Sequence, residues 1–374
     1  MNGSPYYPLA LQPWPREMIW GGRNLERVLH KTLPPGKKIG ETWEAWDDCV
    51  IENGAQRGKT LGALIEKDVN GILGAVVTAQ HKCPLLFKFI DAQDDLSVQV
   101  HPDDAAAQTF DNYPFGKTEA WYILHAEPGA AIIHGFQYNV SPEIVTDYLA
   151  RDKLAQLLAT VPVRAGDVVF VPPGTVHAIT KGIVVAEIQE NSDLTYRLYD
   201  WGRKNPDGKP RELHIAKSLQ VANFKRTTEH QIAPLTIQHD SGAQQFLIAC
   251  RYFALERLDL RAPFTALHTQ GKFVILSLIH GAATITFGAN LSESVTARHG
   301  QTFFLPASLG AFGITPQTET CQVLRAFAPN LRADVIEPLL RAGYSASEIA
   351  RLGGRTPEHN DLLPLVANPP LQSS

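Results

Sequence analysis

The chain has 374 residues, long enough for two or three domains, and its 44% hydrophobic and 19% charged residues are typical of a globular protein. The net charge is −4 and the 34 Lys and Arg residues do not run together, which argues against nucleic-acid binding but allows a local cationic pocket for a small anion. The start lacks signal-peptide features, no apolar run approaches the ~20 residues of a membrane span, and the cysteines are far apart. We therefore expect a cytoplasmic, reduced protein that binds neither nucleic acid nor membrane.

Most of the chain consists of short apolar segments separated by Gly and Pro, which is typical of β-sandwiches and barrels. The expected strands in the first half span residues 84–90, 96–100, 120–124, 131–134, 167–171 and 183–188. One helix is predicted between them. Ser141-Pro142-Glu143 offers an N-cap, a first-turn proline and a favourable acidic residue, and apolar residues then follow at helical spacing.

The sequence predicts four regions. Residues 1–204 form an N-terminal catalytic domain, residues 205–243 a polar connector, residues 244–328 a second strand-rich domain, and residues 329–374 a helical extension with a loose tail that includes Pro369-Pro370. Within the extension, Ser345-Ala346-Ser347-Glu348 is a capping box for a helix that ends at Gly353-Gly354.

The two strand-rich regions share a local pattern. Residues 166–177 and 300–310 each contain a turn glycine, a buried strand and a Pro-containing turn. The pattern resembles the Gly–Pro–His signature of cupin jelly rolls, so we expect a mainly β fold with two cupin-type jelly-roll β-barrels and a few helices. Aligning Pro173 with Pro306 places Gly310 at the position of His177. The second domain should therefore keep the scaffold and lack this histidine, which is a candidate metal ligand in the first.

Two stretches offer the parts of one metal site. Gln99-Val100-His101-Pro102 is followed by Lys117-Thr118-Glu119, and Pro173-Gly174-Thr175-Val176-His177 comes later. Residues two apart on a strand point to the same face, so Gln99 should accompany His101, and Lys117 should accompany Glu119. An amide, two imidazoles and a carboxylate can bind a divalent cation. A Gln near a metal can also orient a water, and Glu119 can equally be a solvent-facing strand residue.

In combination, these motifs resemble type I phosphomannose isomerases of the shorter bacterial kind. The matching segments are Ile19-Trp20-Gly21-Gly22, Gly40-Glu41-Thr42-Trp43-Glu44, Phe87-Lys88-Phe89-Ile90-Asp91-Ala92, Leu96-Ser97-Val98-Gln99-Val100-His101-Pro102, Lys117-Thr118-Glu119, Gly174-Thr175-Val176-His177-Ala178 and Gln189-Glu190-Asn191-Ser192-Asp193-Leu194-Thr195-Tyr196-Arg197. The resemblance implies one Zn²⁺ per chain, held by Gln99, His101, Glu119 and His177. Other divalent metals suit the same nitrogen and oxygen donors.

The resemblance also implies a reaction, the interconversion of mannose 6-phosphate and fructose 6-phosphate through a cis-enediolate. Arg197 matches the catalytic arginine of the family, although an ordinary ion pair with Asp193 or Asp200 is the alternative. Asp193 matches a carboxylate linked to ring opening, but Asn191-Ser192-Asp193 is also good turn sequence. Lys117 is a candidate for the proton-transfer base, and phosphate or carboxylate pairing is its other possible role.

Lys88, Ser97 and Arg203 are candidates for binding the sugar phosphate. Lys88 lies between Phe87 and Phe89, so either the aromatic rings are buried and Lys88 is outside, or Lys88 points into the cavity; the resemblance favours the cavity. Ser97 lies two residues before Gln99 and should face the same way. Arg203 matches a basic position of the family.

Three other functions compete with this isomerase. They are an isomerase of another aldose, a cupin oxygenase with a histidine-rich iron site, and a non-catalytic or regulatory sugar-binding cupin. The amide ligand, the Lys-x-Glu pair and Arg197 fit the isomerase better than the oxygenase. We expect a monomer or a weak homo-oligomer, since exposed strand edges can pair.

Overall fold

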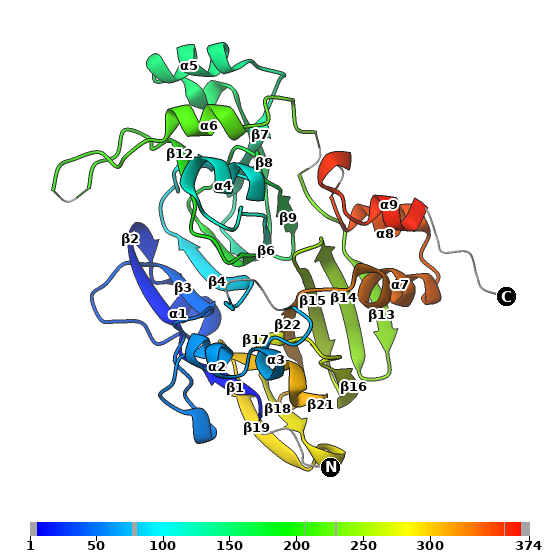
Figure 1. Cartoon of the computed structure of the whole chain (residues 1–374). Coiled ribbons are helices and arrows are strands. Elements are labelled where there is room, and N and C mark those ends of the chain that lie inside the picture. Colours follow the sequence, from blue (N-terminus) through cyan, green and yellow to red (C-terminus); the bar gives the residue numbers. More distant parts are fainter. Residues whose placement is uncertain (1–5, 77–80, 206, 229, 355, 368–374) are drawn as a thin grey trace.

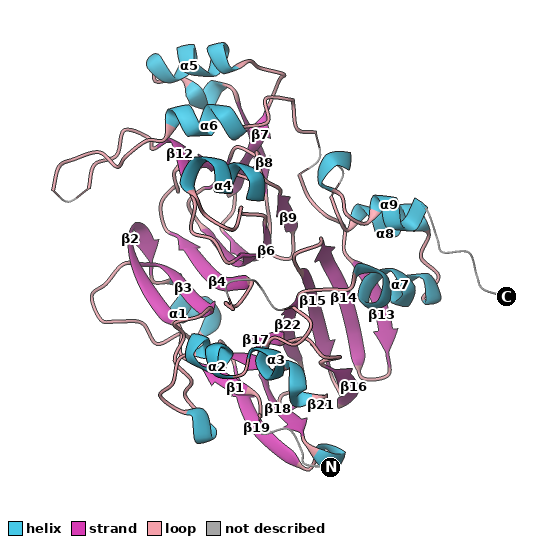
Figure 2. Ribbon diagram, in the orientation of Figure 1, coloured by secondary structure: helices cyan, strands magenta, loops and turns pink. Residues whose placement is uncertain are grey.

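The computed structural model describes residues 6–76, 81–205, 207–228, 230–354 and 356–367. In these ranges the strands form four antiparallel sheets with helices around them (Figure 1, Figure 2). No helix in the described ranges is long and apolar enough to cross a membrane. The mainly β prediction is confirmed.

The N-terminal half contains a six-stranded and a five-stranded sheet that face each other. The six-stranded sheet has the order β2 (Trp14–Gly22), β3 (Ile39–Ala45), β4 (Leu85–Ala92), β11 (Ile183–Glu190), β6 (Glu119–Ala126), β9 (Val168–Val171). The five-stranded sheet has the order β12 (Tyr196–Tyr199), β5 (Val98–Val100), β10 (His177–Ile179), β7 (Ala131–Phe136), β8 (Leu158–Pro162). Apolar side chains of both sheets form one cluster between them, in the manner of a jelly roll.

The barrels expected from the sequence do not close. Among the described strands, the hydrogen-bonded ladders stop at β2 and β9 in one sheet and at β12 and β8 in the other. Side-chain packing joins the sheets instead. One example is the contact between Trp121 of β6 and His177 of β10, whose ring centroids lie 5.5 Å apart. The predicted cupin architecture is therefore present as two layers.

The six-stranded sheet is buried on both faces. Phe87 and Phe89 of β4 point into a core shared with the C-terminal half, while Lys88 points to the opposite face, between the two N-terminal sheets, and is 4% exposed. The sequence offered two alternatives for this segment, buried phenylalanines or an interior Lys88, and neither alone describes it. The phenylalanines are buried and Lys88 is inside as well, because this sheet is covered on both sides.

The C-terminal half is built on a seven-stranded and a four-stranded sheet. The seven-stranded sheet has the order β1 (Leu9–Leu11), β20 (Thr302–Leu305), β17 (Val274–His280), β22 (Cys321–Phe327), β15 (Ala254–Leu260), β14 (Gly242–Ala249), β13 (Leu235–His239). The four-stranded sheet has the order β16 (Phe264–His268), β21 (Ala311–Pro316), β18 (Ala282–Phe287), β19 (Glu293–Arg298). The first strand of the chain thus lies in the sheet of the C-terminal half.

The internal repeat has the expected secondary structure. The strand β9 leads through a Pro-Pro-Gly turn to His177, and β20 leads through Pro306 and the short helix η4 (Ala307–Leu309) to Gly310. Gly310 has a φ of +81°, a left-handed conformation that favours glycine. The second copy therefore has glycine, without a metal-binding side chain, at the place of His177.

Helices cover the sheet edges and form the C-terminal end. The α-helices are α1 (Asn24–Leu29), α2 (Leu61–Lys67), α3 (Val69–Ile72), α4 (Asp104–Asp111), α5 (Pro142–Ala150), α6 (Ile215–Val221), α7 (Glu337–Arg341), α8 (Ala346–Arg351) and α9 (Leu363–Ala367). The other short helices are η1 (Gly54–Gln56), η2 (Leu154–Gln156), η3 (Ala289–Leu291), the π-helical η5 (Leu331–Ile336) and η6 (Pro357–His359).

Two predicted helix starts are confirmed. Ser141 caps α5, its side chain accepting from the Ile144 amide at 3.4 Å, and Ser345 and Glu348 form the capping box of α8. The helix α4, which Asp103 caps, was not predicted, because only Ala107 of this polar helix is buried. The helix α6 lies inside the predicted connector. The predicted loose tail at Pro369-Pro370 lies outside the described residues.

Candidate active site and metal centre

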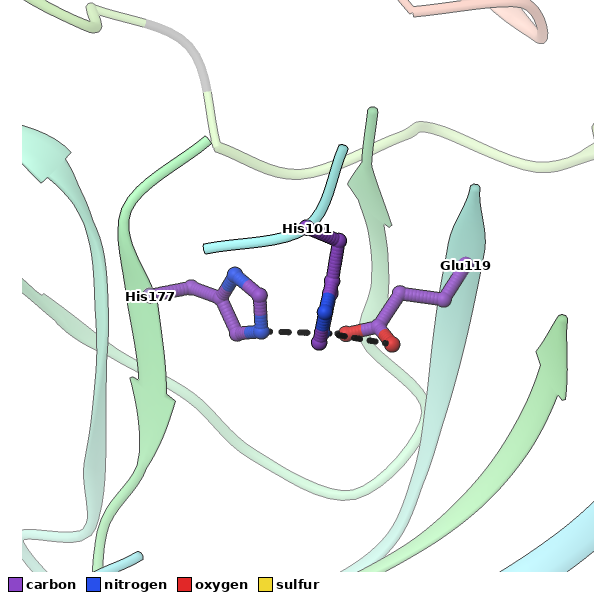
Figure 3. Close-up of side chains that lie close together, drawn as sticks. All are labelled: His101, Glu119 and His177. Atoms are coloured by element: carbon purple, nitrogen blue, oxygen red, sulfur yellow. Dashed lines mark ion pairs between the residues drawn. The ribbon is translucent and has the colours of Figure 1, made fainter. Parts of the chain in front are cut away.

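Three predicted ligands converge between the two N-terminal sheets (Figure 3). His101 follows β5, Glu119 begins β6 and His177 begins β10. The Nε2 atom of His101 lies 3.4 Å from Oε2 of Glu119, and Nε2 of His177 lies 3.2 Å from Oε1 of the same carboxylate. All three donor atoms lie within 4.8 Å of one another, a spacing that one metal ion can bridge.

Backbone contacts orient both imidazoles toward this centre. Nδ1 of His101 lies 2.8 Å from the Leu194 carbonyl oxygen, and Nδ1 of His177 lies 2.8 Å from that of Thr175. A carbonyl oxygen only accepts, so each Nδ1 carries a proton, and Nε2 is the ring atom that faces the centre and could bind a metal. Burial, and next the charge of Lys117, lower the pKa of His101 to about 3. The His101 ring is therefore neutral, as a metal ligand must be.

Gln99 joins the same group from the neighbouring strand. It lies directly opposite His177 in the β5–β10 pairing, and its amide nitrogen is 3.3 Å from Nε2 of His177. The nitrogen and oxygen of an amide exchange places by a simple flip. Its oxygen can therefore face the centre, and all four predicted ligands are brought together.

The carboxylate of Glu119 fits a cation. Both oxygens are buried and accept no hydrogen bond from the described residues. Burial alone would raise the pKa of Glu119, but the neighbouring positive charge, that of Lys117 first, holds it well below its usual range. An ionised, buried carboxylate is costly, and besides the ion pair with Lys117 a bound cation would compensate its charge. Together with the two imidazoles, it makes a donor set suited to a divalent ion.

A chain of alternating charges leads away from Glu119. Lys117 Nζ lies 2.8 Å from Glu119 and 4.0 Å from Glu187, and Lys88 Nζ lies 3.0 Å from Glu187 and 3.9 Å from Glu41. All five residues are at most 9% exposed. Lys117 also lies 3.1 Å from Nε2 of His101. Lys117 and Glu119 thus share a face as predicted, and both lysines are interior.

Glu187 is the site residue that the sequence reasoning missed. It lies at the centre of this chain of charges, and its second oxygen accepts from the Trp121 indole at 2.9 Å. Burial and the Glu119 charge raise its pKa, although Lys88 and Lys117 oppose this shift. The available signal was a glutamate inside the otherwise apolar segment 183–188, since a charge in a buried strand needs a partner.

Arg197 lies on the other sheet, in line with two of the ligands. The β12–β5 pairing sets Arg197 opposite Gln99, which in turn is opposite His177, so the three lie in one row. Its Nε donates to Ser97 Oγ at 3.3 Å and its Nη1 to the Glu212 carbonyl at 2.8 Å. Ser97 is buried and faces Arg197.

The two aspartates considered as partners of Arg197 bind other arginines. Asp193 is exposed and lies 3.4 Å from Nη1 of Arg16. Asp200 pairs with Arg203 at 2.6 Å and also with Arg211. Burial, the largest cause, and then the positive charge of Arg211 lower the pKa of Arg197. Arg203, predicted as a phosphate ligand, is thus held by Asp200, and Arg211 is an additional cation.

Comparisons with known proteins agree with this site. A family model described as "Phosphomannose isomerase type I, catalytic domain" matches residues 9–135, which include Gln99, His101 and Glu119. A second, "Mannose-6-phosphate isomerase, cupin domain", matches residues 242–325.

The chain matches individual relatives over nearly the whole of their length. The mannose-6-phosphate isomerase ManA of Bacillus subtilis is 36% identical over 83% of this chain and 97% of its own. The mannose-6-phosphate isomerase of Streptococcus mutans is 34% identical over 81% and 93%. A crystal structure of a mannose 6-phosphate isomerase from Bacillus subtilis superposes with a TM-score of 0.78 at 31% identity, covering 86% of this chain and 99% of that one. The chain therefore belongs to the family of type I phosphomannose isomerases.

Proposed function

We propose that this protein is a metal-dependent isomerase that interconverts mannose 6-phosphate and fructose 6-phosphate. The observation that carries the proposal is the convergence of His101, Glu119 and His177 beside a buried lysine, in a chain of this family. Moving a carbonyl between C1 and C2 requires a base for the carbon-bound proton and positive charge for the oxygens of the enediolate. The site offers both.

The metal in this proposal is Zn²⁺, held by Gln99, His101, Glu119 and His177. Two imidazoles, one carboxylate and one amide oxygen suit zinc and would leave a position open for a sugar oxygen. The bound ion would act as a Lewis acid that stabilises negative charge on that oxygen.

Lys117 is the proposed base. Its Nζ is 2.8 Å from Glu119 and 3.1 Å from His101, so it lies beside the place where the carbonyl end of the open sugar would bind. A lysine must lose a proton before it can accept one. A divalent cation bound beside the lysine would favour its neutral amine, which could then accept the carbon-bound proton.

Arg197 is proposed to stabilise the enediolate. Its charge is permanent, its planar guanidinium can contact two oxygens, and it lies in the row of Gln99 and His177. Asp193, exposed at the edge of the site beside the Leu194 carbonyl that binds His101, is proposed to assist ring opening.

The remaining candidates would bind the substrate. Arg203 and Arg211 share the single carboxylate of Asp200, which leaves net positive charge near Arg197 and Ser97 for a phosphate. Lys88, interior and between Glu41 and Glu187, would bind sugar oxygens deeper in the site. We further propose that the enzyme is a cytoplasmic monomer or weak homo-oligomer, which gel filtration would measure.

The test is a coupled assay of fructose 6-phosphate formation with and without chelator, followed by added Zn²⁺, alongside elemental analysis. We expect about one divalent ion per chain, loss of activity on chelation and recovery with zinc. A His101→Ala, His177→Ala double variant should bind no ion. A double variant of two exposed histidines, His239→Ala and His280→Ala, is the matched control. Full metal content in the first double variant would contradict the ligand assignment.

A further inference from the structure

The helical extension returns to the catalytic half of the protein. Figure 1 shows α7, α8 and α9 gathered on one side of the molecule, beside β13 and β14. Leu352, which follows α8, accepts a hydrogen bond from the Ala249 amide of β14 at 3.2 Å. The family-model match of the second domain ends at residue 325, so the extension lies beyond the matched residues.

Asn360 closes the segment after α8 into a compact loop. Its side chain is 7% exposed and donates to the carbonyls of Ala350, at 2.7 Å, and Gly354. Its oxygen accepts from the amides of Leu362 and Leu363 at 3.0 and 2.9 Å. These bonds define a clasp that comprises Leu352–Gly354 and Thr356–Asp361, and each of them fixes a main-chain group of the extension.

The clasp contacts β9, the strand that leads to the third metal ligand. Gly354 has a φ of +80°, and a Cβ built on it would lie 2.8 Å from Cδ1 of Phe170. Phe170 comes two residues before the Pro172–Gly174 turn, and its carbonyl accepts from Nε2 of the buried His134 at 2.9 Å. Gly354 therefore lies against a strand whose position is already fixed from the other side.

His359 lies at the junction of the clasp with two ligand-bearing loops. Together with Pro172, Pro173 and Asp103 it lines a cavity of about 330 Å³. Asp361 anchors this end of the clasp, because its carboxylate accepts from the main-chain amide of Arg251 at 2.8 Å and from the Arg251 Nε at 2.7 Å.

The ligand-bearing loops are themselves bonded to each other. The Gly174 amide donates to the His101 carbonyl at 2.9 Å, and the Lys117 amide donates to the Pro102 carbonyl at 2.9 Å. His177 follows the Pro172–Gly174 turn directly along the chain, whereas His101 is linked to the turn through the Gly174–His101 hydrogen bond. A displacement of the turn would therefore move His177 more than His101 and change the distance between the two imidazoles.

We propose that Gly354 and His359 are positioning residues of the metal centre: the clasp fixes the Pro172–Gly174 turn and so sets the spacing of His101 and His177. The inference rests on the proposed function only in requiring that this centre holds a divalent ion. Altering residues that hydrogen-bond directly to metal ligands changes metal affinity by about 10–100-fold, and because the clasp acts through the turn we expect an effect at the lower end of that range. This positioning role does not require the clasp to contact the substrate.

The test compares two alanine substitutions, Gly354→Ala and Gly343→Ala. Both glycines have positive φ, +80° and +91°, so both variants carry the same kind of backbone penalty. A Cβ at Gly343 meets nothing within 4 Å, whereas one at Gly354 meets Phe170. Zinc release from each holoenzyme to excess chromogenic chelator, the absorption spectrum of the cobalt-loaded protein and the urea midpoint are measured together.

Gly354→Ala should release zinc about tenfold faster than wild type and alter the cobalt spectrum, while Gly343→Ala matches wild type in both. Adding Phe170→Leu to Gly354→Ala makes room for the new methyl group and should restore slow release. His359→Ala introduces no backbone strain and should also accelerate zinc release. It replaces Gly354→Ala as the test variant if Gly354→Ala does not fold.

Two results separate this inference from the proposed function. If the wild type holds zinc and isomerises its substrate, but Gly354→Ala and His359→Ala release zinc no faster than Gly343→Ala, the positioning role is wrong and the proposed function stands. If the wild type holds no divalent ion, the proposed function fails and this inference fails with it.

Discussion

The buried pair of Lys88 and Glu187 permits a quantitative test of the interior charges. Both side chains are at most 5% exposed and their charged atoms lie 3.0 Å apart. Glu187→Gln keeps the size of the side chain and its bond from the Trp121 indole, but leaves Lys88 with Glu41 at 3.9 Å as its nearest carboxylate. Breaking a buried pair from one side costs about 3–5 kcal/mol, because the remaining charge stays out of water.

The expected loss of unfolding free energy for Glu187→Gln is therefore about 3 kcal/mol, the lower value because Glu41 still compensates in part. Urea unfolding of the zinc-loaded protein measures it through the midpoint and slope. In the double variant Glu187→Gln, Lys88→Met, the isolated charge is gone and stability should return to within about 1 kcal/mol of wild type. A single variant as stable as wild type, or a double variant less stable than the single one, would refute the reasoning.

Three further changes have defined outcomes. Burial, and then the Asp104 charge, raise the pKa of Glu190 from 4.5 to about 8, so this carboxyl stabilises the fold fully below about pH 4.5 and the stability is lost as the pH rises toward 8. Relative to wild type, Glu190→Gln should gain about 1.4 kcal/mol per pH unit across that window in urea titrations, and a pH-independent difference would contradict the assignment. Asp200→Asn removes the carboxylate that positions Arg203 and Arg211 and should raise KM for mannose 6-phosphate with little change in kcat; an unchanged KM would place the phosphate elsewhere. Ser345→Ala removes the capping box of α8 and should lower stability by about 1 kcal/mol in the same titrations while activity stays at the wild-type level; an unchanged midpoint would show that the box contributes nothing.

Local sequence patterns predicted the parts of the fold that depend on neighbouring residues. The strand bearing Gln99 and the helix capped by Ser141 were predicted because alternation and capping are short-range signals. The pairing of β1 with β20 could not be predicted in this way, because it joins distant parts of the chain. The helix α4 was missed because its sequence is polar and it buries little apolar surface.

The metal ligands of the candidate site could be predicted because several motifs flank them. The positions of other site residues could not, because they depend on which sheet covers which face of a strand. Flanking motifs identified His101 and His177, and the structure brings them together with Glu119. Alternation alone left Lys88 ambiguous, because the second face of β4 is covered by the C-terminal half. Glu187 acquires its place only when β4, β11 and β6 are side by side.

The placement of β1 has a consequence for biosynthesis. Leu9–Leu11 is translated long before Thr302–Leu305, the strand with which it forms its ladder. Residues 50–53 can bond to one edge of this strand early, through pairs such as the Glu52 amide and the Ala10 carbonyl, but the edge that faces β20 stays unmatched, and such an edge invites pairing with another chain. Completion of the seven-stranded sheet thus waits for the synthesis of residues 302–305, and translation products that stop before Thr302 would lack it.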